Sequence, residues 1–211
     1  MSPNENGHFE FRKEDHSYWL DGVQIPSATQ IIKLCGLIDD RWYKPEHRTR
    51  GTLVHAGCHH ISENDMDWKQ WEEAHPELLG YLRAYEKFLA DSGFKPTICE
   101  KPHYHENLRY GVTVDNIGTS ASALENEIVE LKSGSMMRWT ALQTALQAMA
   151  WFPDSCYTIR RTGVELHSDG TYRTESFANA NDFPVVTGMV GVAHWKLENF
   201  RGGHLNGSPS Q

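Results

Sequence analysis

The feature that most constrains the fold is a pair of apolar, β-branched segments joined by a polar stretch. The first reads Gly-Val-Thr-Val-Asp over residues 111–115, and the second reads Asn-Glu-Ile-Val-Glu-Leu-Lys over residues 126–132. Val, Ile and Thr favour strands, so we predict a β-hairpin. Side chains alternate between the two faces of a strand, so Glu130 and Lys132 point one way and Leu131 points into a core.

Two carboxylates and an ammonium group therefore converge at the end of this hairpin, since Asp115 closes the first strand. Such a group can hold a divalent cation and polarise a water molecule, which is the chemistry of a metal-dependent phosphodiesterase. Acidic-x-Lys triplets also arise by chance, and the alternative is a solvated strand end with a weak surface ion pair. The triplet Asp67-Trp68-Lys69 has no strand-like run before it, and we give it no weight.

The composition fits a single domain. A chain of 211 residues with seven Trp can build a sizeable core. No apolar run is long enough to span a membrane, and no basic segment followed by an apolar one resembles a secretory signal, so we expect a cytoplasmic location. We expect one domain over residues 1–201, with short strands in 1–26, and a disordered polar tail over 202–211.

Cysteine spacing and charge narrow the chemistry. The four cysteines are scattered without a Cys-x-x-Cys pair, which favours buried free thiols over a zinc or iron–sulfur site. The net charge of −8 argues against broad, non-specific coating of nucleic acid. It remains compatible with an enzyme acting on phosphodiesters, because metal-binding carboxylates add negative charge and the substrate path needs only local positive charge.

Several segments before the hairpin have clear local signals. Asp21-Gly22 predicts a two-residue turn between short strands, and Ser27-x-x-Gln30 has the form of a capping box that begins a helix. Residues 51–61 look helical, with His55 and His59 four apart on one face. A zinc site there needs further ligands that the sequence does not supply. We predict an amphipathic helix over residues 76–89 whose apolar stripe belongs to the core, ended by Gly93.

The remaining segments complete a mixed sheet. A strand from about residue 94 to 105 carries Glu100, and a helix from 138 to 150 presents Gln143 and Gln147 in a polar stripe. A second hairpin over 157–177 precedes a helix from about 180 to 200. This order of elements predicts a central mixed sheet with helices on its faces.

Residues 39–50 form the strongest local cluster of positive charge. Two interpretations are open: an ordinary solvated loop, or a contact to phosphates with an aromatic ring stacked on bases. The candidate DNA-binding residues of this cluster are Arg41, Trp42, Lys44, Arg48 and Arg50. Ser27 and Thr29 are further candidates for a phosphate pocket, although for Ser27 we favour a role as helix N-cap only.

Five segments, in order, resemble the PD-(D/E)xK nuclease superfamily and within it the RecB-like and lambda-type phage exonucleases. They are the helix with His55, the strand with Glu100, the strand with Asp115, the Glu130-Leu131-Lys132 strand and the helix with Gln143. The resemblance implies a restriction-endonuclease-like α/β core with a central mixed β-sheet flanked by helices. Gln147 departs from it, because the family motif Gln-x-x-x-Tyr has Tyr there. Val114 stands where many members have Pro.

The resemblance also implies roles for these residues. Asp115, Glu130 and the backbone carbonyl of Leu131 would bind Mg²⁺ or Mn²⁺, with His55 beside them and Glu100 serving a second metal or a water. Lys132 would orient the attacking water or stabilise transition-state charge. On the next helix, Gln143 would hold the water, Lys132 or a nearby phosphate, and Gln147 would contact DNA. The four-cysteine set of some relatives is missing, so no iron–sulfur cluster is expected.

The function implied is a DNA exonuclease of phage or bacterial recombination or repair, acting in the cytoplasm of a bacterium or a phage-infected host cell. A structure-specific or nicking endonuclease with the same site is an alternative. A DNA-binding module with a degenerate site is another, and the complete set of Asp115, Glu130 and Lys132 argues against it. A single-strand annealing or recombination protein is a candidate partner. The polarity, strand preference and oligomeric state, including a trimer, are left open.

Overall fold

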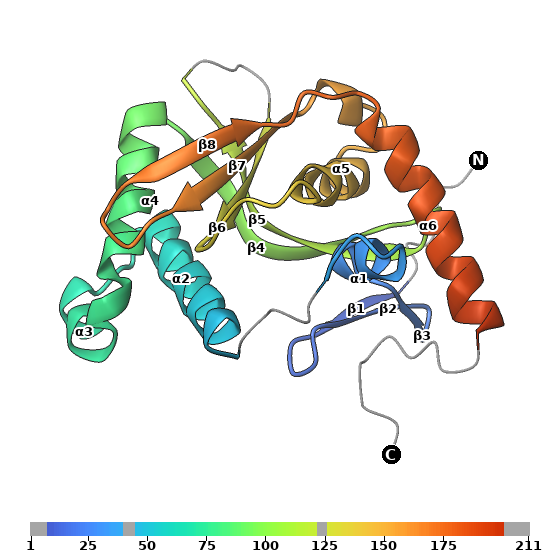
Figure 1. Cartoon of the computed structure of the whole chain (residues 1–211), viewed down its shortest axis with the longest axis horizontal. Coiled ribbons are helices and arrows are strands. Elements are labelled where there is room, and N and C mark those ends of the chain that lie inside the picture. Colours follow the sequence, from blue (N-terminus) through green and yellow to red (C-terminus); the bar gives the residue numbers. More distant parts are fainter. Residues whose placement is uncertain (1–7, 40–44, 122–125, 201–211) are drawn as a thin grey trace.

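A five-stranded mixed sheet forms the centre of the protein. The computed structural model describes residues 8–39, 45–121 and 126–200. The sheet contains β4 (Lys95–His105), β5 (Tyr110–Thr119), β6 (Glu127–Lys132), β7 (Arg160–Leu166) and β8 (Tyr172–Ser176), in that spatial order (Figure 1). β6 and β7 are parallel and the other neighbours are antiparallel. The parallel pair requires a crossover connection, which is provided by α5 (Thr140–Trp151).

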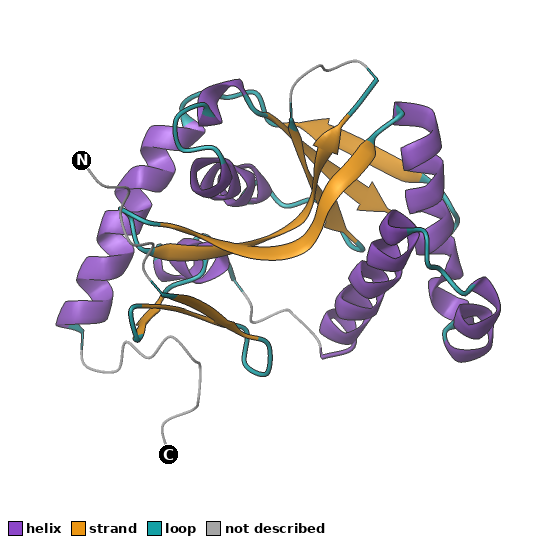
Figure 2. Ribbon diagram, turned by 180° about the vertical axis from the view of Figure 1, so that it is seen from behind, coloured by secondary structure: helices purple, strands orange, loops and turns teal. Residues whose placement is uncertain are grey.

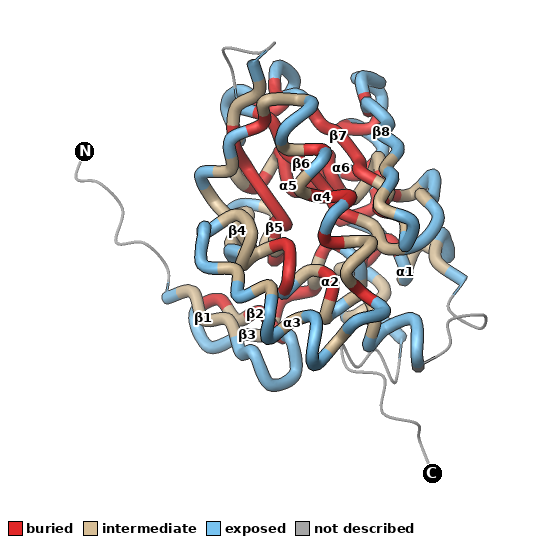
Figure 3. Tube along the Cα trace, turned by 90° about the vertical axis from the view of Figure 1, so that its left-hand side faces the viewer, coloured by how far each residue is buried: buried red, intermediate tan, exposed pale blue. Residues whose placement is uncertain are grey.

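Helices cover the sheet in two groups. α1 (Ala28–Leu34), α5 and α6 (Asp182–Asn199) share one apolar cluster with β5. α2 (Pro45–Glu63) and α4 (Leu79–Ser92) share a second cluster with β6 and β7, and α3 (Trp68–Ala74) lies beyond them (Figures 1 and 2). Buried residues are concentrated on the central strands (Figure 3). This arrangement confirms the predicted fold class of a mixed sheet flanked by helices.

Local signals in the sequence explain several element boundaries. The Ser27 side chain accepts a hydrogen bond from the Gln30 N–H, and the Gln30 side chain accepts one from the Ser27 N–H. These two bonds complete the predicted capping box of α1. Asp21 and Gly22 both have positive φ, at 55° and 75°, as a tight hairpin turn requires. Gly93, with φ of 63°, ends α4 in the left-handed region.

A small antiparallel sheet of β1 (Phe9–Arg12), β2 (Ser17–Leu20) and β3 (Val23–Ile25) packs against β5. Gly111 permits this contact, because a Cβ there would lie 2.2 Å from Cγ of Tyr18. The Tyr18 hydroxyl lies 2.7 Å from Oγ1 of Thr113, and the Gly111 N–H donates to the carbonyl of Pro26. The small sheet thereby fixes the start of α1 against β5.

Four boundaries differ from the predictions. α2 begins at Pro45 rather than Gly51, because Pro45 suits a first helical turn and Glu46 favours the positive end of the helix dipole. β5 continues to Thr119, so Asp115 lies within a strand instead of ending it. The segment around residue 76 is a 3₁₀ turn, η1 (Pro76–Leu78), and a second one, η2 (Cys156–Thr158), precedes β7.

Other predictions are resolved as follows. The discounted triplet begins α3, with Asp67 as its N-cap. All four cysteines are free thiols, but only Cys58 and Cys156 are fully buried. No helix among the described residues is long and apolar enough to cross a membrane. The tail predicted over 202–211 lies outside the described residues.

Candidate active site

A cavity of about 400 Å³ lies where the small sheet, α2 and α5 meet the strands β4 to β6. Most of the residues predicted for catalysis and metal binding line it. These are His55, Glu100, Asp115, Glu130, Lys132, Gln143 and Gln147, with Ser27 and Thr29 at the start of α1. The tertiary fold therefore brings together side chains that are more than ninety positions apart in the chain.

One part of the site consists of His55 and two carboxylates. Nδ1 of His55, on α2, lies 3.2 Å from Oδ1 of Asp115 and 3.3 Å from Oε1 of Glu100. The possible ligand atoms of the three residues all lie within 4.8 Å of one another, so the group could hold a metal ion. One imidazole nitrogen and two carboxylate oxygens suit a divalent cation of the Mg²⁺ or Mn²⁺ type.

Glu100 reaches this group through an unusual backbone conformation. Its neighbours Cys99 and Lys101 pair with Asn116 and Val114 in β5, while Glu100 itself has φ of 46°. A non-glycine residue in the left-handed region costs about 1–3 kcal/mol, and such strain is concentrated at functional sites. The surrounding sheet holds Glu100 in this conformation beside Asp115.

The two carboxylates of this group control the pKa of His55. Burial lowers the pKa of His55, but Asp115 and Glu100 outweigh it and hold that pKa well above its usual range. The single positive charge of the resulting imidazolium offsets only one of the two carboxylate charges, so the group keeps a net negative charge that favours a cation. A metal ion taking this place would displace the proton, because a ligating histidine is neutral.

Glu130 forms the second part of the site. It is 2% exposed, and its Oε1 accepts hydrogen bonds from Nζ of Lys132 at 2.6 Å and Nε2 of Gln143 at 2.6 Å. Nε2 of Gln147 donates to its Oε2 at 2.8 Å. Burial raises the pKa of Glu130 and the charge of Asp115 raises it further, whereas Lys132 opposes both effects.

The ligand set that the resemblance implied is only partly assembled. Glu130 lies in the cavity, but its oxygens are engaged by three donors and it is outside the compact group around His55. Leu131 is buried and donates its backbone N–H to Oδ2 of Asp115 at 2.6 Å, a contact that the sequence did not predict. This bond fixes the Asp115 carboxylate where β5 and β6 separate.

Gln147 has a structural position instead of an open surface position. Its side chain is 1% exposed and also donates to the carbonyl of Thr113 at 3.1 Å, while its Oε1 has no hydrogen-bond partner among the described residues. We predicted it as a DNA contact. Its burial shows that it orients Glu130, while Gln143, one helical turn earlier and more exposed, bonds to both Glu130 and Lys132.

The predicted DNA-binding residues are spread over different places. Arg50 lines a second cavity, of about 660 Å³, which shares His55 and Lys132 with the first. Its Nε is buried without a hydrogen-bond partner in the part of the chain that the structure describes. Arg48 is exposed on the same helix. The candidates that lie outside the described residues are Arg41, Trp42 and Lys44.

Sequence reasoning missed His16 and Tyr18, which line the first cavity from the small sheet. A single sequence does not indicate that a terminal hairpin folds over a distant strand. A glycine within a strand, such as Gly111, is consistent with close packing against an aromatic ring.

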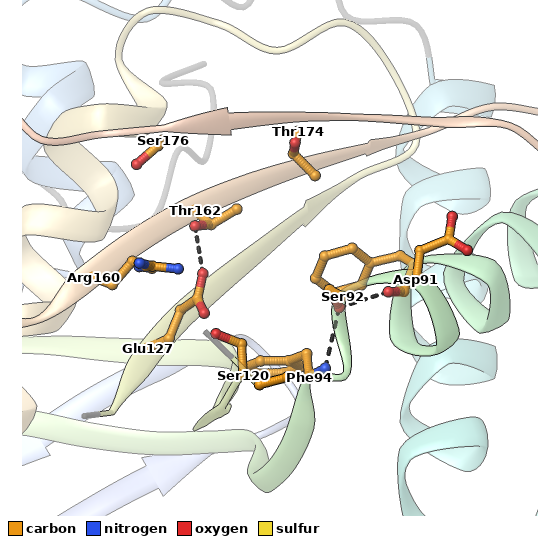
Figure 4. Close-up of a pocket in the computed structure, with 11 residues that line it drawn as sticks. Asp91, Ser92, Phe94, Ser120, Glu127, Arg160, Thr162, Thr174 and Ser176 are labelled. Carbon is orange, nitrogen blue, oxygen red and sulfur yellow. Dashed lines mark hydrogen bonds between the residues drawn. The ribbon is translucent and has the colours of Figure 1, made fainter. Parts of the chain in front are cut away.

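A further polar cavity of about 660 Å³ lies at the other end of β6 (Figure 4). There Thr162 donates to the buried Glu127 at 2.6 Å, and none of the predicted site residues is present.

Comparison with known proteins gives limited information. No protein-family model matches the chain, and no curated protein matches it in sequence. A solved structure from Eubacterium rectale, provisionally named an exonuclease, is 13% identical with a TM-score of 0.45, covering 81% of this chain and 74% of that one. LHK-Exo, solved in complex with dAMP, is 12% identical with a TM-score of 0.35, covering 82% and 92%. Similarity at this level carries no functional inference, so the site itself must do so.

Proposed function

We propose that this protein is a divalent-metal-dependent deoxyribonuclease of the PD-(D/E)xK type, acting as an exonuclease. The observation that carries the proposal is the convergence of Asp115, Glu130 and Lys132 with His55 and Glu100 in one cavity. Four separate elements, α2, β4, β5 and β6, supply these five side chains. A purely structural ion pair needs only one acid and one base, not three carboxylates around a cavity open to a ligand.

The donor atoms fit the cation that the proposal requires. Asp115, Glu100 and His55 would hold it, and Glu130 would join them on release from its hydrogen bonds. When bound, a Mg²⁺ or Mn²⁺ ion neutralises phosphate charge and lowers the pKa of a water molecule. Asp115 is oriented for this role by the Leu131 N–H.

Lys132 and Gln143 supply the remaining polar groups. The Lys132 ammonium is partly exposed to the cavity and lies between Glu130 and Gln143, where it can donate to a water molecule or to a phosphoryl oxygen. Such a donor stabilises negative charge that develops in the transition state. Gln143 and Gln147 restrict Glu130 and through it fix the position of the ammonium group.

The most direct test compares two buried carboxylates on one strand. Glu130→Gln and Asp115→Asn should abolish Mn²⁺-dependent hydrolysis of end-labelled duplex DNA. Glu127→Gln, three positions earlier on β6 but in the far cavity, should retain it, because Thr162 can donate equally well to an amide oxygen. Full activity in Glu130→Gln, or equal loss in Glu127→Gln, would show that the site lies elsewhere.

The exonuclease mode and the role in bacterial or phage recombination or repair are proposed from the motif resemblance. A closed circular duplex tests the mode, since an exonuclease leaves it intact whereas a nicking enzyme relaxes it.

We further propose that Arg50, together with the exposed Arg48 on the same helix, binds a phosphate near the cleaved bond. Arg50→Met should weaken binding of 5′-phosphorylated DNA more than of 5′-hydroxyl DNA, while Arg83→Met on α4 should not; equal weakening of both ends contradicts an end-phosphate pocket.

A further inference from the structure

A second group of metal-ligating side chains lies beside the candidate active site. It consists of His59 and Glu63 on α2 and Cys99 on β4, whose possible ligand atoms all lie within 4.8 Å of one another. His59 and Glu63 are four residues apart, which places them on one face of the helix. Folding supplies from β4 the third ligand that the sequence alone did not provide for His59.

The imidazole of His59 has a nitrogen that is free to bind a ligand. Nδ1 of His59 is buried without a hydrogen-bond partner among residues 8–39, 45–121 and 126–200. The adjacent His60, by contrast, has its Nδ1 2.9 Å from Oδ1 of Asp65. Cys99 is a free, partly buried thiol. A buried ring nitrogen with no partner costs free energy, and ligation of a metal ion would recover it.

The chemistry of the donors separates this group from the first one. A thiolate, an imidazole and a carboxylate suit Zn²⁺ or a similar transition-metal ion, whereas Mg²⁺ avoids sulfur. Three protein ligands leave the fourth tetrahedral position for water. The first group contains only nitrogen and oxygen donors, so the two groups select different ions.

We propose that His59, Glu63 and Cys99 bind one zinc-type ion, distinct from the cation of the proposed nuclease site. His59 lies one helical turn after His55, and Cys99 immediately precedes Glu100. An ion joining them clamps α2 to β4 and holds His55 against Glu100. Binding of this ion is independent of the proposed nuclease activity; only its positioning effect rests on that activity.

The test is optical and uses no DNA. The full-length protein, stripped with a chelator and kept reduced, is titrated with Co²⁺. We expect a near-ultraviolet thiolate-to-Co²⁺ charge-transfer band that saturates at one ion per chain and disappears when Zn²⁺ is added in stoichiometric amount. Cys99→Ser should abolish the band, and His59→Gln should weaken binding at least about 10–100-fold, the loss typical even for residues that only support ligands.

Two variants provide matched controls. Cys35→Ser removes another partly exposed thiol, at the end of α1 beside Met189, and should leave the band unchanged. Asp115→Asn disrupts the first group only and should also leave it unchanged. Circular dichroism verifies that each variant is folded. The proposal is overturned if no band forms, if the band survives in Cys99→Ser, or if Asp115→Asn removes it as completely.

Discussion

Replacing Lys132 with Met tests the central electrostatic contact of the site. Nζ of Lys132 lies 2.6 Å from Glu130, whose side chain is 2% exposed, while the Lys132 side chain is 21% exposed. Breaking a buried ion pair from one side costs about 3–5 kcal/mol, and exposed pairs contribute little. For this partly exposed lysine we expect Lys132→Met to lower the free energy of unfolding by about 2–4 kcal/mol in a chelator. Gln143 and Gln147 limit the loss, since both still donate to Glu130.

The same substitution should also reduce hydrolysis in protein that remains folded. Loss of a positioned proton or charge donor typically lowers the rate about 10²–10⁴-fold. The assays are urea unfolding monitored by tryptophan fluorescence and Mn²⁺-dependent cleavage of end-labelled DNA. Lys69→Met is the matched control, because Lys69 belongs to an acidic-x-Lys triplet on the exposed helix α3; its effect should stay within about 0.5 kcal/mol. A Lys132→Met protein that is as stable and as active as its parent would refute the reasoning.

Three further predictions concern stability. Burial raises the pKa of Glu165, but hydrogen bonds with the Met136 N–H and with His167 and the charge of Arg173 outweigh burial and lower that pKa. The Glu165 carboxylate therefore stabilises the fold above the ordinary glutamate pKa. This stabilisation is lost as the pH falls through the folded pKa. Glu165→Gln should therefore cost about 1–2 kcal/mol in urea unfolding near neutral pH and almost nothing once the pH lies below the folded pKa of Glu165; a deficit that does not depend on pH would contradict this. Gly111→Ala should cost at least about 1–3 kcal/mol, since the new methyl group would overlap the ring of Tyr18; an unchanged melting temperature would show that the small sheet docks differently. Arg161→Met should cost about 3–5 kcal/mol by leaving Asp182 unpaired, and adding Asp182→Leu should recover part of it; additive losses would rule out coupling.

Local signals made much of the fold predictable. The capping box at Ser27, the turn at Asp21-Gly22 and the helix end at Gly93 each depend on a few neighbouring residues, and the structure has all three. The start of α2 was wrong because residues 45–50 carry charges typical of either a loop or a helix terminus. Val54 and Cys58, further along the same helix, pack into the second cluster, and the helix extends back from them to Pro45, which is not visible locally.

The site was predictable in membership but not in its contacts. Alternation within β6 placed Glu130 and Lys132 on one face, and helical spacing grouped Gln143 with Gln147. The sequence could not show that both glutamines donate to Glu130, nor that a left-handed backbone at Glu100 forms a group with His55. These contacts depend on how strands twist and separate, which only the tertiary structure determines.

The parallel pairing of β6 with β7 has a consequence for synthesis on the ribosome. A nascent chain that ends before residue 140 already carries Asp115 and Glu130, but not the α5 donors Gln143 and Gln147, and β6 still has an open edge. Without these two donors, burial of the Glu130 carboxylate is less favourable than its hydration in water. We expect the site to form only after α5 and β7 have emerged and docked, so an unfinished chain should have no competent site.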